Sequence, residues 1–237
     1  EPHSGYEHYR EAFRNWQADL SPSTPWSVDW RIEDRYRHLP SAADVHLRYT
    51  DLTEGVEAYT AESWIYTNYE GHSAFGYPAV ETWIPMIMQR RRHVGDGPLH
   101  STFVSLIEPY ENQSNISHIR RLPLATPDGA SYPDSCVSVE VTLTDGRKDL
   151  LIAADVENPS QLQTAWQPGR TMVQLEWDVH VDGQLAWFRK NERGQLQRMA
   201  LCKVGRVEVG GWQVVPPLES DYVEYEIEDG RPRIVSD

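Results

Sequence analysis

Polar and apolar residues alternate along several stretches of the chain, and this alternation predicts β-strands. In DVHLRYTD (44–51) three apolar side chains alternate with three polar ones, Val45, Leu47 and Tyr49 against His46, Arg48 and Thr50. A period of two is that of a half-exposed strand. Residues 57–66 and 81–92 continue the strand pattern. Residues 100–110 carry apolar side chains on both faces, so we expect a central, buried strand there.

The second half of the chain reads as a series of hairpins with glycine at the turns. Short strand-like runs flank Asp145-Gly146, Asp182-Gly183, Arg193-Gly194 and Asp229-Gly230. Aspartate before glycine favours tight hairpin turns, because both central residues need positive φ. We therefore expect turns at all four places.

About a dozen strands with short turns predict an all-β fold, an antiparallel β-sandwich or barrel. Aromatic residues at roughly helical spacing in 4–19 indicate a short N-terminal helix or an irregular lead-in. We expect one sandwich region over residues 1–237, with a possible seam near 157–169 before a smaller C-terminal sheet, since that stretch is polar and contains proline.

Composition adds that the chain is globular and acidic. Hydrophobic residues make up 39% of the 237 residues, and the net charge is -14. This charge argues against nucleic acid and anionic membranes as partners, and no apolar stretch is long enough to cross a bilayer. The start of the chain shows no signal-peptide pattern. Two cysteines, Cys136 and Cys202, predict free thiols, with one disulfide as the alternative.

Basic residues are locally concentrated in spite of the net charge. Arg90, Arg91, Arg92 and His93 are consecutive, and Arg120 and Arg121 are adjacent. These runs fit either an anion-binding patch or solvated strand ends. His46 and Arg48 share the polar face of one predicted strand, where they line a cleft or meet water. These eight residues are the candidate substrate-binding groups.

Other chemistry leaves few signals. No nucleophile elbow, zinc helix, phosphate loop or dinucleotide fingerprint occurs, and the nine histidines form no dense cluster, so we expect neither metal nor cofactor. Glu108 ends an apolar strand, and we expect backbone donors or an arginine to hold it, Arg120 or Arg121 if their strands pair. Six of the nine tryptophans lie near predicted strand ends or loops, where they fit either sugar stacking or core packing: Trp26, Trp30, Trp64, Trp83, Trp166 and Trp212.

Several stretches together resemble the C-terminal β-sandwich region of heparinase II/III-like polysaccharide lyases. They are WSVDWRIEDRY, VHLRYTDLTEGVEAYTAESW, WIPMIMQRRR, STFVSLIEPYENQSNISHIRRL and VSVEVTLTDGRKDLLIAAD, which cover roughly residues 26–156. The resemblance implies an antiparallel β-sandwich of the super-sandwich type and an α/α-toroid domain in the same parent protein. It also implies an acidic polysaccharide bound in a cleft and a bacterial periplasmic or secreted location.

The chain itself shows no toroid pattern, and no catalytic residue of the family maps onto it. We therefore expect a region that shapes or supports the cleft and is inactive without the toroid, and whether the chain alone is an enzyme stays open. A C-terminal part of a larger lyase, one chain of a processed enzyme and a free-standing carbohydrate-binding or structural module remain the three alternatives.

Overall fold

The structure, a computed structural model, is all-β, with antiparallel sheets in a sandwich-like arrangement. It describes residues 13–34, 38–40, 43–66, 81–93, 95–96, 99, 101–154, 171–217 and 221–236. The first twelve residues, which hold most of the predicted lead-in, and the predicted seam at 157–169 lie outside these ranges. Among the described residues no helix is long and apolar enough to span a membrane.

The chain divides into two compact units. Unit 1 comprises Glu1–Trp26 and Thr53–His100, and unit 2 comprises Ser27–Leu52 and Ser101–Asp237. In unit 1 a three-stranded sheet has the order β1-β4-β5, formed by β1 (Phe13–Asp19), β4 (Glu57–Tyr66) and β5 (Glu81–Arg90). The described end of the predicted lead-in, Phe13–Asp19, is thus a strand.

Unit 2 holds a second three-stranded sheet in the order β2-β3-β6. Its strands are β2 (Trp26–Arg31), β3 (Val45–Asp51) and β6 (Ser105–Glu111). The prediction of a central, buried strand over 100–110 is wrong, because β6 pairs with β3 and lies at the sheet edge, and Ile107 is 63% exposed. Apolar residues on both faces therefore do not mark burial on both sides here.

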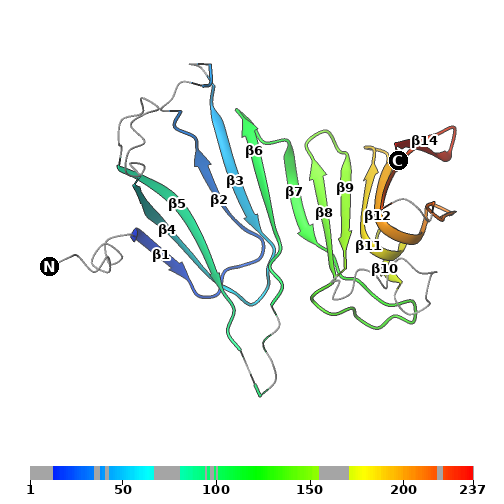
Figure 1. The fold of residues 1–237 in the computed structure, drawn as a ribbon, viewed down its shortest axis with the longest axis horizontal. Coiled ribbons are helices and arrows are strands. Elements are labelled where there is room, and N and C mark those ends of the chain that lie inside the picture. The colour runs from blue at the N-terminus through cyan, green and yellow to red at the C-terminus, as the bar shows by residue number, and fades with distance from the viewer. Residues whose placement is uncertain are drawn as a thin grey trace. The chain divides into compact units, whose positions relative to one another are not determined.

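A nine-stranded sheet forms the rest of unit 2. Its main order is β15-β14-β12-β11-β9-β8-β7, and β10 and β13 pair with β11 and β12 (Figure 1). The strands are β7 (Ile116–Arg121), β8 (Val137–Leu143), β9 (Lys148–Ala153), β10 (Met172–Gln174), β11 (Val179–Lys190), β12 (Leu196–Val209), β13 (Trp212–Val214), β14 (Tyr222–Glu228) and β15 (Arg231–Ser236). Strands on both sides of the predicted seam belong to this one sheet.

The predicted hairpin turns occur at three of the four glycine positions. β8 and β9 meet at Asp145-Gly146, β11 and β12 at Arg193-Gly194, and β14 and β15 at Asp229-Gly230. The turn predicted at Asp182-Gly183 is wrong, because β11 runs through it without turning.

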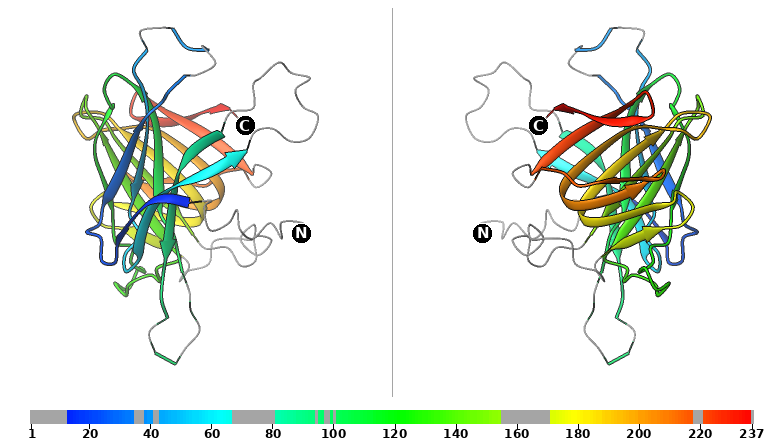
Figure 2. Two further views of the ribbon diagram at one scale, coloured as in Figure 1. Left: turned by 90° about the vertical axis from the view of Figure 1, so that its left-hand side faces the viewer. Right: turned by 90° about the vertical axis from the view of Figure 1, so that its right-hand side faces the viewer.

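Gly183 instead allows the long β11–β12 ladder to bend. The ladder shifts register between Asp182 and Gly183, and a Cβ at Gly183 would lie 2.5 Å from Val204 Cα and 2.9 Å from Lys203 O. Only glycine permits so close an approach of two backbones. Figure 2 shows β11 and β12 curving through the sheet.

The bend places two parts of one sheet on either side of a common core. The N-terminal part of β11 pairs with β10, and its C-terminal part pairs with β9. Side chains from both parts form one buried cluster, in which Val179, Val181 and Val207 accompany Leu150 and Phe188. The nine-stranded sheet therefore folds over on itself, and its two parts pack against each other as the two layers of a sandwich.

Candidate functional site

The predicted arginine run at the end of β5 is paired with a carboxylate of its own unit. Arg90 and Arg92 both donate to Glu57, and Arg90 Nη2 also donates to the Tyr59 hydroxyl at 2.7 Å. Hydrogen bonds from Arg92, then Tyr59 and Arg90, lower the pKa of Glu57 to about 2 in spite of some burial. Arg91 is half-buried with partners of its own, and His93 is exposed.

The second predicted arginine pair lies on β7 in unit 2. Arg120 donates to Glu140 at 2.8 Å and to Glu176 at 2.7 Å, and Arg121 lies 2.8 Å from Asp134. The two predicted arginine runs thus belong to different units, and Arg90, Arg92, Arg120 and Arg121 are each matched with carboxylates.

His46 and Arg48 lie together in a polar cluster on one face of the β2-β3-β6 sheet. Asp29 of β2 is at its centre, because His46 Nδ1 lies 2.8 Å from Asp29 Oδ1 and Arg48 Nε donates to Asp29 Oδ2 at 2.9 Å. Tyr110 of β6 stacks on His46 with 4.9 Å between ring centroids and also donates its hydroxyl proton to Asp29. Sequence alternation predicted the shared face of His46 and Arg48, but not their partners on β2 and β6.

The charges of this cluster stabilise one another. Burial alone would raise the pKa of Asp29, but hydrogen bonds from Tyr110, His46 and Arg48 hold it below its usual range. The same Asp29 carboxylate raises the pKa of the Tyr110 hydroxyl. The Tyr110 hydroxyl, His46 and Arg48 are thus all engaged with the same carboxylate.

Glu108 is buried and structural, as its position predicted, but its partners differ from the predicted ones. Ser114 donates to Glu108 Oε1 at 2.7 Å, and Arg48 Nη1 lies 3.8 Å from Oε2. Neither Arg120 nor Arg121 is its partner, because β6 pairs with β3 and not with β7. Both cysteines are free thiols, as predicted.

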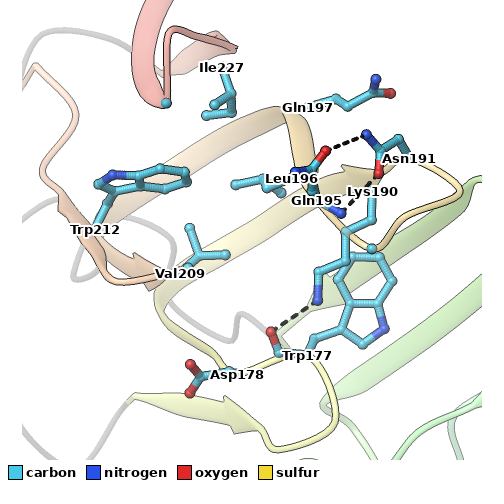
Figure 3. A pocket seen from close by; sticks show the side chains of 13 residues that line it. Trp177, Asp178, Lys190, Asn191, Gln195, Leu196, Gln197, Val209, Trp212 and Ile227 are labelled. Carbon is cyan, nitrogen blue, oxygen red and sulfur yellow. Dashed lines mark hydrogen bonds between the residues drawn. The ribbon is translucent and has the colours of Figure 1, made fainter.

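A hollow in unit 2 opens at one end of the curved sheet (Figure 3). It has a volume of about 640 Å³, within the range typical of ligand pockets. Its walls come from the segment before β11, the β11–β12 turn, both ends of β12, the start of β13 and the β14–β15 turn. The lining residues are Trp177, Asp178, Lys190, Asn191, Gly194, Gln195, Leu196, Gln197, Val209, Gly210, Trp212, Ile227 and Gly230.

Trp212 provides the apolar side of the hollow. Its ring lies beside Leu196 and Val209, with Ile227 above them in the view of Figure 3. Gly210 has φ of 57°, and a Cβ there would lie 3.2 Å from the Trp212 ring. The turn before β13 therefore needs a residue without a side chain in order to seat the indole.

Trp177 and Lys190 form the opposite end. Trp177 is buried and donates its indole N–H to Glu140 Oε2 at 2.7 Å, which fixes the ring. Lys190 Nζ lies 4.3 Å from the centroid of that ring and donates to the Trp177 carbonyl at 3.3 Å. Burial lowers the pKa of Lys190, although Asp178 and Glu140 oppose this effect.

Amide and carboxylate groups make up the polar rim. Asn191 Oδ1 accepts from the backbone N–H groups of Arg193 and Gln195, and its amide donates to Gln195 Oε1 at 3.1 Å. Gln197 and Asp178 are exposed on the same rim. The arrangement offers a flat apolar surface next to several hydrogen-bonding groups, which suits a ligand with one apolar face and many hydroxyl groups.

Sequence reasoning named Trp212 only as one of six tryptophans near strand ends or loops, and it missed Trp177, Lys190 and the amides. They come from the segment before β11, from the β11–β12 turn and from the turn after β12, and no pattern within one stretch of the sequence predicts that these segments line one hollow. No group of three or more histidine, cysteine or acidic side chains in the described ranges could hold a metal ion. No protein-family model matches this chain, and no curated protein sequence matches it.

Proposed function

We propose that this chain is a carbohydrate-binding β-sandwich region. The observation that carries the proposal is the hollow of about 640 Å³, in which Trp212 faces a rim of amide, carboxylate and ammonium groups. A sugar ring has a C–H face that stacks on an indole and an edge of hydroxyl groups that donate and accept hydrogen bonds. The hollow supplies both kinds of contact side by side.

The pairing of the arginines favours stacking over charge as the source of affinity. Each of Arg90, Arg92, Arg120 and Arg121 already contacts a carboxylate, so a ligand anion has to compete for it. The acidic polysaccharide that the resemblance implies stays a prediction. Salt separates the two modes, since stacking tolerates salt and exposed ionic contacts do not.

The resemblance to heparinase II/III-like lyases supplies the wider proposal. In that setting the region supports a polysaccharide cleft and carries out no elimination by itself, and an α/α-toroid of the same parent protein is its partner. A steady rise in unsaturated-uronide absorbance, when the purified chain meets heparin, heparan sulfate or alginate, would overturn this part.

Binding is tested by affinity electrophoresis of the chain through gels that contain xylan, glucomannan, alginate or heparan sulfate. We expect retardation by at least one of them, and we expect Trp212→Ala to weaken it about tenfold, because stacking contributes on the order of 1 kcal/mol beyond the area that it buries. Trp16→Ala removes a tryptophan that is 48% exposed on β1 in unit 1, so it is the matched control.

Two results would contradict the proposal. One is free migration of the wild-type chain in every gel. The other is equal loss of retardation in Trp212→Ala and Trp16→Ala, since general surface hydrophobicity would then explain the binding.

A further inference from the structure

A second hollow adjoins the first along the face of the same unit. It has a volume of about 250 Å³ and shares Trp177, Lys190, Asn191 and Gly194 with the hollow that Trp212 lines. Its other walls come from β7, β8, β9 and the turn after β11. Two adjacent hollows with common walls can bind neighbouring sugar units of one glycan.

Lys190 lies at the junction of the two hollows. Its side chain reaches from the end of β11 to the Trp177 carbonyl and ring, as Figure 3 shows. Its ammonium group has three donors, and one of them is used by that carbonyl. The remaining N–H groups can donate to oxygen atoms of a ligand that passes from one hollow to the other.

The second hollow is lined by charges of both signs. Its cations are Arg120, Lys148 and Lys190, and its carboxylates are Glu140, Glu176 and Glu192. The formal charges cancel, and Asp178 on the rim of the first hollow adds one negative charge. An anionic sugar gains nothing from such a surface, whereas hydroxyl groups can donate to the carboxylates and accept from the cations.

Lys148 and Glu192 are exposed groups of this hollow, whereas Glu176 is engaged by Arg120 at 2.7 Å. The Lys148 side chain is 44% exposed, and its Nζ is 3.8 Å from Glu140 Oε1, which is longer than a hydrogen bond. Glu192 is exposed in the turn between β11 and β12. Both are thus able to contact a sugar unit without first breaking a strong ion pair.

We propose that the two hollows form one binding track for an internal segment of a linear, uncharged glycan. One sugar ring stacks on Trp212, the chain passes Lys190, and a following sugar unit lies between Lys148 and Glu192. This inference rests on the proposed carbohydrate-binding function and deepens it, because it specifies that the site binds consecutive sugar units within a glycan and not a single terminal sugar.

The test is a length series measured by isothermal titration calorimetry. Monosaccharides and the linear cello-, xylo- and manno-oligosaccharides up to the hexasaccharide are titrated into the full chain. We expect the affinity in the best series to rise about tenfold between the shortest and the longer members, equivalent to one additional favourable subsite. We expect Lys148→Ala and Glu192→Ala to remove this rise.

The control is Arg147→Ala, since Arg147 neighbours Lys148 but pairs with Asp145 outside the hollow. The proposal is overturned by equal affinity at every length, or by Lys148→Ala and Glu192→Ala variants that keep the full rise. Failure of the proposed carbohydrate-binding function gives a different result. In that case no oligosaccharide of any length binds, or Trp212→Ala binds every oligosaccharide with the affinity of the wild-type chain. Both substituted residues are on the surface, and a thermal unfolding curve of each variant checks that it folds.

Discussion

Glu140 on β8 connects the core of unit 2 with the wall of the hollow, and its removal makes a sharp test of the structure. The residue is 3% exposed. Its carboxylate accepts from Arg120 Nε at 2.8 Å and from Trp177 Nε1 at 2.7 Å, and Lys148 lies 3.8 Å away. Replacement by alanine removes a charge and leaves two donors without their acceptor.

The size of the effect follows from the burial of these donors. Breaking a buried ion pair by removing one partner costs about 3–5 kcal/mol. The Arg120 side chain is 36% exposed and also contacts Glu176, so water and that second carboxylate recover part of the loss. We therefore expect Glu140→Ala to lower the free energy of unfolding by about 2–4 kcal/mol, and Glu140→Gln, which keeps one acceptor oxygen, by about 1–2 kcal/mol.

Urea unfolding followed by tryptophan fluorescence measures the loss, with the slope of the transition held equal to that of the wild-type chain. Glu228→Ala is the control, because Glu228 pairs with Arg233 on the exposed end of β14 and such pairs contribute about 0–1 kcal/mol. The reasoning is refuted if Glu140→Ala and Glu228→Ala lose the same small amount.

The same carboxylate predicts an acid dependence. Burial would raise the pKa of Glu140, but hydrogen bonds from Arg120 and Trp177 and the charge of Lys148 lower it below its usual value. The stabilisation is therefore present above the unfolded-state pKa, about 4.3, and is lost as the pH falls through the lower folded-state pKa. Glu140→Gln should flatten this part of the stability curve, and an unchanged curve would contradict the assignment.

Three further measurements test other parts of the molecule. Gly183→Ala places a Cβ 2.5 Å from Val204 Cα, and we expect a loss of about 3 kcal/mol in urea unfolding, because backbone atoms cannot move aside as a side chain can. Ultraviolet titration should find that Tyr49 has a pKa of about 12, because burial and then the hydrogen bond to Asp51 raise it. The free energy of unfolding should then fall as the pH rises from about 10, the pKa of an unfolded tyrosine, through 12. Carbon NMR should give Glu57 a pKa of about 2, and Arg92→Ala should raise it, since Arg92 makes the largest contribution to the lowering.

The hairpins were predictable because their signals are local. Aspartate and glycine at Asp145-Gly146 and Asp229-Gly230 determine a turn within a few residues. At Asp182-Gly183 the same dipeptide serves a different purpose, since Gly183 is needed for the approach of Val204, which is far along the chain. A pattern read within one stretch cannot distinguish these two uses of glycine.

The candidate site was less predictable, because partners come from remote segments. The shared face of His46 and Arg48 followed from alternation, yet Asp29, which holds them, lies on another strand. Arginine runs suggested an anion site, but the carboxylates that pair with them lie in other parts of the sequence, as Glu140 does for Arg120.

The apolar end of the hollow shows the same limit of local patterns. Trp177 and Trp212 line one hollow although 34 residues separate them in the sequence, because Val179 of β11 pairs with Val209 of β12 and the start of one strand thus lies beside the end of the other. Neither tryptophan carries a local signal that distinguishes it from the others in the chain.

The bend at Gly183 has a consequence for how the domain comes apart. β11 and β12 each contribute to both layers of the nine-stranded sandwich, so neither layer can detach while these two strands stay paired on both sides of the bend. Amide hydrogens of the two layers should therefore exchange through one shared opening event, at the rate of global unfolding. A ligand that bridges the open end would slow exchange throughout the sandwich, far beyond the residues it touches.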